Sequence, residues 1–256
     1  MNTERTSKIN HLLQLQPSGT VFTSSWLVDQ GYSLDLQKQY RNSNWFESIG
    51  LGAMKRMNDD VPLEGALFAL QQQLNLHIHI GGKSALGLHG KVQYLQFGSS
   101  TATLFGPLDE TLPKWFRDYD KWRDGYQLTR SDFLPQGIGM TDHSFGNYSL
   151  KVSSPARAMM ECLYLVPKKQ PLVECYEIME GLNNLRPASV QQLLEKCGSI
   201  KVKRLFLLLA EKAGHSWFDY IKLERINLGT GKRSLVPKGT YNAKYQLTLP
   251  KELDDR

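Results

Sequence analysis

Cysteines and long apolar runs are scarce in this 256-residue chain. The three cysteines, Cys162, Cys175 and Cys197, lie far apart in apolar helical patterns. We therefore expect reduced, buried thiols, as in a cytoplasmic protein, and no disulfide framework. No apolar run approaches the roughly 18 residues that a membrane span needs. The polar start, MNTERTSKIN, lacks the apolar segment of a secretory signal. We thus expect neither a membrane protein nor a disulfide-rich secreted one.

Patterns typical of catalysis and metal binding are also lacking. The pair His77 and His79 alternates along a predicted strand, but no further His or Cys has the spacing to complete a metal site. We expect an exposed strand face there instead. The segment 229–233, GTGKR, fails as a phosphate loop because Ile226 stands where its first glycine is required and Arg233 where Ser or Thr is required. We expect a tight turn in that segment, and no enzyme activity, metal or cofactor.

The positive charge is unevenly distributed along the chain. The formal net charge is +6, but residues 1–60 are neutral and residues 61–150 carry −1. Residues 151–256 hold 18 Lys and Arg against 11 Asp and Glu, a surplus of +7. The hydrophobic content of 41% is ordinary for a globular protein of one or two domains. The basic surplus therefore belongs to the C-terminal part and requires its own explanation.

The first 60 residues have the element order of a winged helix-turn-helix. Apolar spacing predicts a helix over residues 9–16, and further helices over about 24–30 and 34–44, the last capped by Ser33. Two short strands, 45–49 and 53–57, follow on either side of a Gly-Leu-Gly turn. Three helices and a two-stranded wing make the expected DNA-binding domain, residues 1–60.

The third helix is the candidate for insertion into the major groove of DNA. Its polar residues are of the kinds that contact bases and phosphates, since Gln and Asn can pair with adenine and Arg with guanine. The wing adds two cations for phosphate or minor-groove contacts. The candidate DNA-binding residues are Gln37, Lys38, Arg41, Asn42, Asn44, Lys55 and Arg56. A solvated helix face beside a hairpin, serving as a small protein–protein module, remains the alternative.

Residues 61–256 predict a mixed domain of helices and strands, so we expect an α+β (mixed) fold: a winged helix followed by an α/β domain. Helices are expected after Pro62 and Ser154, and over 83–89, 172–182, 188–197 and 202–212, with one helical turn near Trp115. Strands are expected over 76–80, 92–97, 101–105, 126–133 and 148–152, and within the tail 234–249.

A group of cations opens the most apolar predicted helix. Lys201, Lys203 and Arg204 fall in its first turn, where positive charge opposes the helix dipole at roughly 0.3–1 kcal/mol each. We therefore interpret them, with Lys232 and Arg233, as an anion-binding cluster, helped by the free N–H groups of that turn. The alternative is that their side chains turn back to local carboxylates such as Glu195.

Five segments in the C-terminal half have a recognisable order and spacing. They are SSPARAMMECL at 153–163, KVKRLF at 201–206, AEKAGHSW at 210–217, LGTGKR at 228–233 and YNAKYQLTLPKEL at 241–253. On these segments the chain resembles the AbiEi-type antitoxins, transcriptional regulators of type IV toxin–antitoxin systems in abortive infection. The resemblance extends over nearly the whole chain and is strongest from about residue 150.

The resemblance implies a winged helix that binds repeats in the operon's own promoter. It also implies a C-terminal domain that counters a nucleotidyltransferase-like toxin, without a stable complex between the two. A nuclease-like enzyme guided by the winged helix is an alternative, although its carboxylates show no metal-site spacing. An RNA-binding module is another, motivated by the basic surplus after residue 150.

Overall fold

A computed structural model describes residues 3–91, 101–237 and 239–253, with side chains from residue 8 onward. The predicted strand at 92–97 lies outside the described residues. Internal contacts divide the chain into two compact units. The first comprises Met1–His79, Asp109–Gln127 and Asp142–Lys151, and the second comprises Ile80–Leu108, Leu128–Thr141 and Val152–Arg256.

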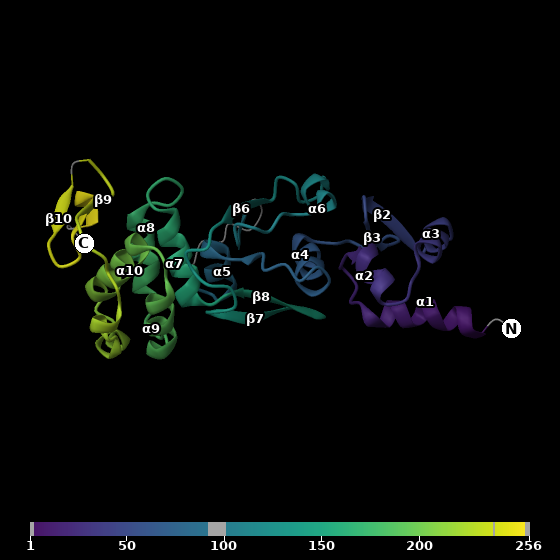
Figure 1. Ribbon diagram of the computed structural model, residues 1–256, viewed down its shortest axis with the longest axis horizontal. Helices are drawn as coiled ribbons and strands as arrows, with labels where there is room; N and C mark the ends of the chain where they lie inside the picture. The colour runs from purple at the N-terminus through teal and green to yellow at the C-terminus, as the bar shows by residue number, and fades with distance from the viewer. Residues whose placement is uncertain (1–2, 92–100, 238, 254–256) are drawn as a thin grey trace. The chain divides into compact units, whose positions relative to one another are not determined.

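The first unit begins with a winged helix-turn-helix (Figure 1). Helices α1 (Thr3–Leu15), α2 (Ser24–Asp29) and α3 (Leu34–Asn42) precede the wing strands β2 (Phe46–Gly50) and β3 (Ala53–Arg56). A strand that the sequence analysis missed, β1 (Phe22–Thr23), pairs antiparallel with β3. The resulting sheet has the order β1-β3-β2. At two residues, β1 is too short to produce a visible alternation of apolar and polar side chains.

Helix boundaries in this domain follow from local chemistry. The Ser33 hydroxyl accepts a hydrogen bond from the Leu36 amide at 3.3 Å, which caps α3. Phe22 and Phe46 pack edge to face, with ring centroids 5.0 Å apart, inside the apolar core between the helices and the sheet. The predicted order of three helices and a hairpin is confirmed.

Helix α4 (Leu63–Gln72) follows the winged helix, and the side chain of Gln73, directly after α4, forms hydrogen bonds with the winged helix. The Gln73 amide donates to the Val21 carbonyl and accepts from the Thr23 amide, both at 2.7 Å. These bonds satisfy the Thr23 amide of β1 and the carbonyl of the residue that precedes this strand. Helix α6 (Lys114–Asp118), predicted as one turn near Trp115, also belongs to the first unit.

A five-stranded sheet has the order β6-β5-β4-β8-β7. Its strands are β4 (His79–Ile80), β5 (Ala102–Gly106), β6 (Tyr126–Arg130), β7 (Met140–Phe145) and β8 (Tyr148–Ser153). Strands β4 and β6 are shorter than the predicted 76–80 and 126–133, and β7 was missed. Strand β7 alternates between half-buried and exposed residues, but only Met140 and Phe145 at its ends are apolar, so its sequence lacks the apolar alternation that marks a strand.

Helices dominate the second unit. Helix α7 (Pro155–Leu165) packs against α5 (Gly82–Leu88), α8 (Leu172–Glu180), α9 (Pro187–Lys196) and α10 (Ile200–Lys212). The tail forms β9 (Arg233–Ser234), β10 (Thr240–Asn242) and β11 (Leu247–Leu249), a small sheet of order β10-β11-β9. The helices predicted here are confirmed within a few residues, because their apolar faces are long and regular. The mixed α+β class is likewise confirmed.

A buried ion pair on α7 organises the centre of the second unit. Arg157 and Glu161 lie 3.0 Å apart, with side chains 7% and 0% exposed. Glu161 also accepts hydrogen bonds from the Ser153 hydroxyl and the Gly82 amide, so its charge is fully hydrogen-bonded. Arg157 donates further to the Pro135 and Ile138 carbonyls. A buried pair satisfied in this way has a structural role.

Candidate nucleic-acid interface

One face of α3, together with Asn44 just after the helix, is polar, accessible and free of internal partners among the described residues. Lys38, Asn42 and Asn44 are exposed, and Arg41 is half-buried. Within the described part of the chain, none of these four side chains forms a hydrogen bond or an ion pair. Asn44 has a φ of 57°, a left-handed conformation that asparagine tolerates, and it ends the helix. This face can therefore meet an external hydrogen-bonding partner without breaking an internal contact.

Gln37 does not belong to that face, contrary to the prediction. It is only 1% exposed, and its amide donates to the Ser24 carbonyl at 3.1 Å and the Tyr32 carbonyl at 2.9 Å. The side chain thus joins α3 to the start of α2 and the turn between the two helices. The sequence pattern failed here because a buried amide and an exposed one occupy the same kind of position in a helix.

The two wing cations are also held internally. Lys55 lies 2.8 Å from a Glu47 carboxylate oxygen and donates to the Asp59 carbonyl at 2.6 Å. Burial disfavours the charged form, but the hydrogen bond to Glu47 raises the pKa of Lys55 above its ordinary value. The Arg56 guanidinium donates to the carbonyls of Leu13 and Gln16, at the C-terminal end of α1. The prediction that both residues are available to phosphate is therefore wrong.

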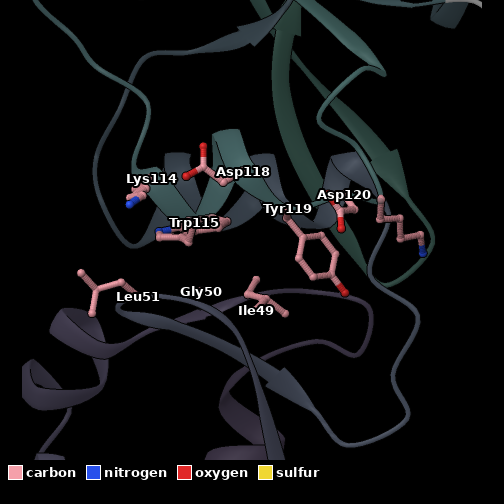
Figure 2. A pocket seen from close by; sticks show the side chains of 9 residues that line it. Ile49, Gly50, Leu51, Lys114, Trp115, Asp118, Tyr119 and Asp120 are labelled. Atoms are coloured by element: carbon pink, nitrogen blue, oxygen red, sulfur yellow. The ribbon is translucent and has the colours of Figure 1, made fainter.

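The wing turn instead packs against α6. Ile49, Gly50 and Leu51 line a pocket of 540 Å³ together with residues of α6 and the loop that follows it (Figure 2). The backbones are in close contact, since a β-carbon added to Gly50 would lie 2.9 Å from the Trp115 β-carbon. Sequence analysis missed this contact because more than 60 residues separate the partners. The available signal was a tryptophan, Trp115, in a short predicted helical turn.

The predicted anion-binding cluster on α10 is largely buried. Arg204 is 2% exposed and donates to the Leu228 and Gly231 carbonyls, both at 2.8 Å. Lys203 is 4% exposed. The Lys201 ammonium donates to the Tyr164 carbonyl at 2.7 Å, and burial lowers the pKa of Lys201. Lys203 and Arg204 therefore do not join an accessible anion site, whereas Lys201 and Arg233 line one pocket with Ser199 and Ile200 at the start of α10, where anion binding stays a prediction.

The physical reason is that long cationic side chains bury their alkyl stems and find backbone carbonyls beyond their own helix. The Glu195 alternative does not hold for these residues either, because Glu195 pairs with Arg225 at 2.9 Å. Lys232 and Arg233 are the two members of the cluster that remain exposed. The Lys232 ammonium lies 5.1 Å from the centroid of the Tyr241 ring.

Family models match both parts of the chain. One described as "Transcriptional regulator, AbiEi antitoxin, Type IV TA system" matches residues 99–250. A second, for the AbiEi antitoxin N-terminal domain, matches residues 5–97. This chain belongs to the AbiEi antitoxin family. It is thus related to transcriptional regulators and antitoxins of type IV toxin–antitoxin systems, as the resemblance implied.

The AbiEi layout is also seen in a solved structure of low sequence identity. The crystal structure of the RV2827C protein from Mycobacterium tuberculosis aligns with a TM-score of 0.53 at 11% identity. The alignment covers 89% of this chain and 85% of that protein, which supports a shared fold. No curated protein sequence matches the chain.

The three thiols and the His77–His79 pair of this AbiEi protein are buried or paired. Cys162, Cys175 and Cys197 are free and buried, as predicted. His79 is 4% exposed, so the prediction of an exposed histidine face is wrong, and His77 contacts Glu110 at 2.7 Å. In the described ranges, no group of three or more His, Cys, Asp or Glu side chains could hold a metal ion. No described helix is long and apolar enough to span a membrane.

Proposed function

We propose that this protein binds double-stranded DNA in its own promoter through α3 and represses its own operon. The observation that carries the proposal is the unpartnered polar face of α3, Lys38, Arg41 and Asn42, with Asn44 just after the helix, within a winged helix-turn-helix. In this fold the third helix enters the major groove. Arg41 is suited to guanine, Asn42 and Asn44 to adenine, and Lys38 to phosphate.

A mobility-shift titration with the DNA upstream of the protein's own reading frame tests this function. Arg41→Ala should weaken binding to that duplex by about 1–3 kcal/mol, while binding to a scrambled duplex changes little. Lys38→Ala should weaken both equally. Lys168→Ala, which removes an exposed cation from the second unit, is the control. Wild-type binding that does not distinguish the two duplexes would overturn the proposal.

The second part of the proposal is an antitoxin activity in the C-terminal part of the protein, which we propose acts in the cytoplasm. It would counter a nucleotidyltransferase-like toxin encoded beside it, without forming a stable complex. The family and the +7 surplus after residue 150 support this. The exposed Lys232 and Arg233 are the surface cations that we assign to the task. Rescue of cells expressing the neighbouring toxin is the direct assay.

Two other activities compete with this assignment of the C-terminal part. An RNA-binding module is favoured by the exposed basic–aromatic pair Lys232 and Tyr241. A nuclease-like enzyme would require a carboxylate cluster for metal ions. Filter binding with single-stranded RNA, and cleavage assays with Mg²⁺ and Mn²⁺, separate these activities from the antitoxin function. We propose that the protein catalyses no reaction.

A further inference from the structure

The wing turn of this protein carries no charged residue, although winged helices commonly place this turn against DNA phosphates. The turn is Gly50-Leu51-Gly52, and Leu51 at its tip is 88% exposed. The two cations of β3 are held by internal partners, as described above. Neutralising phosphates with Lys or Arg is the main source of sequence-independent affinity for DNA. If the protein binds DNA, the cations beside the turn must come from elsewhere.

Helix α6 provides cations at a fixed distance from the wing turn. Trp115 is 4% exposed and lies directly against Gly50, whose φ of 147° is readily accessible only to glycine. A register shift between Ser48 and Gly50 bends β2 at this point. The wing turn and α6 are therefore held together by backbone contact and a buried aromatic ring, both within the first unit.

Two exposed cations lie on α6, three residues apart and hence on the same side of the helix. They are Lys114, which lines the pocket beside the turn, and Arg117. Figure 2 shows the Lys114 side chain at the same end of the pocket as Leu51. Among the described residues, neither cation forms a side-chain hydrogen bond or an ion pair.

The neighbouring cations form ion pairs with carboxylates. Lys121 pairs with Asp60, and Arg123 pairs with Asp120 at 3.1 Å. Asp118 also lines the pocket and is exposed, so its carboxylate opposes an anion at the same place. Along α6 itself, two unpaired cations, of which Lys114 lines the pocket, stand against the one carboxylate of Asp118.

From this arrangement we infer that Lys114 and Arg117 of α6 serve as the phosphate-contacting cations of a composite wing. The uncharged turn around Leu51 lies against DNA, and α6 provides the positive charge that the hairpin itself lacks. The inference rests on the proposed DNA-binding function and assigns phosphate contacts to a helix outside the winged helix-turn-helix.

Salt-dependent binding of the purified full chain to a labelled duplex of its own upstream DNA tests the inference. Lys114→Ala/Arg117→Ala should lower affinity about tenfold and reduce the slope of log K against log salt by up to about 2, near 0.9 per lost contact. Asp118→Asn, which removes the opposing charge, should raise affinity about twofold to fivefold. Lys168→Ala/Lys169→Ala removes two exposed cations from the second unit and should leave the slope unchanged.

The outcomes separate this inference from the function on which it rests. If Arg41→Ala weakens binding but the α6 double variant keeps the wild-type affinity and slope, the composite wing is wrong and the DNA-binding function stands. If the wild-type chain fails to bind the duplex, the proposed function is wrong, and the inference with it. Unchanged thermal melting of each variant confirms that the substitutions at exposed positions leave the fold intact.

Discussion

At the scale of single residues, burial separates side chains that the sequence treats alike. Gln37 and Arg41 lie one helical turn apart on α3, and both are suited to base recognition. Gln37 is enclosed and holds two backbone carbonyls, whereas Arg41 is half-buried and has no internal partner among the described residues. Replacing Gln37 should therefore lower stability and leave DNA affinity unchanged, whereas replacing Arg41 should lower DNA affinity and leave stability unchanged.

Gln37→Met should lower the free energy of unfolding by about 1–3 kcal/mol, because it removes the hydrogen bonds to the Ser24 and Tyr32 carbonyls and leaves the Tyr32 carbonyl without the donor that it has from Gln37. The folded variant should bind DNA as the wild type does. Arg41→Ala should keep the stability and lose affinity. Urea denaturation and mobility shifts on the same preparations check both expectations. A Gln37→Met protein of full stability and weakened affinity would return this residue to the interface.

The three thiols should be unreactive in the native state. Burial raises the pKa of Cys162, Cys175 and Cys197, that of Cys175 to about 12. Because the reactive species is the thiolate, Ellman's reagent at pH 8 should label none of them until urea unfolds the chain. A pKa that is higher in the folded state means that folding favours the neutral thiol. The thiols therefore contribute fully to the free energy of unfolding below about pH 8.5, which is the pKa of a thiol in the unfolded chain. This contribution is lost as the pH rises toward 12. Rapid native labelling at pH 8 would contradict this.

At the scale of elements, contacts between distant segments position the exposed groups. Gly50 allows the wing and α6 to approach, so Gly50→Ala should push α6 away without changing any charge. We expect the salt slope of DNA binding to fall by up to about 2, as for the α6 double variant. Gly52→Ala strains the same turn, at a φ of 80°, but an added β-carbon there meets no atom within 4 Å, which makes it the matched control. Equal slopes for the two glycine variants would contradict the contact's role.

The turn over Leu228–Gly231 depends similarly on one buried cation. Arg204 donates to three carbonyls of that turn, including Gly229 at 3.1 Å. Arg204→Met should lower the free energy of unfolding by about 1.5–3 kcal/mol, because the carbonyls of this turn lose a charged hydrogen-bond donor. Hydrogen exchange should show lost protection in β9 and β11. Arg233→Met, at an exposed neighbouring position, should leave that protection unchanged.

At the scale of the whole molecule, the uneven charge distribution suggests a division of labour between DNA binding and toxin control. Lys232→Glu/Arg233→Glu should abolish rescue of cells that express the neighbouring toxin. Promoter affinity should fall by less than about tenfold, or roughly 1.4 kcal/mol, because these cations lie outside the winged helix. Lys168→Glu/Lys169→Glu makes the same charge change on another exposed segment and should retain rescue. Full rescue by a folded Lys232→Glu/Arg233→Glu variant would remove these residues from the antitoxin surface.

The sequence by itself determined the elements with strong local signals. The helices of the N-terminal domain, the wing and the long helices α7 to α10 follow from apolar spacing, caps and turn residues, which act over a few positions of the chain. The segments at 153–163, 201–206 and 241–253 sufficed to indicate the AbiEi family. Strands β1 and β7 were not predicted, because a short or polar strand forms through its pairing with other strands and has no sequence pattern of its own.

Only the tertiary structure decided which of the candidate side chains are available. Gln37, Arg56 and Arg204 have the chemistry of nucleic-acid contacts, but carbonyl groups from other parts of the chain take up their hydrogen-bond donors. Lys114 and Arg117 belong to a helical turn that the sequence predicted near Trp115, but only the packing of Trp115 against Gly50 places this turn beside the wing. The physical reason is that local propensity depends on near neighbours in the chain, whereas burial and pairing depend on neighbours in space.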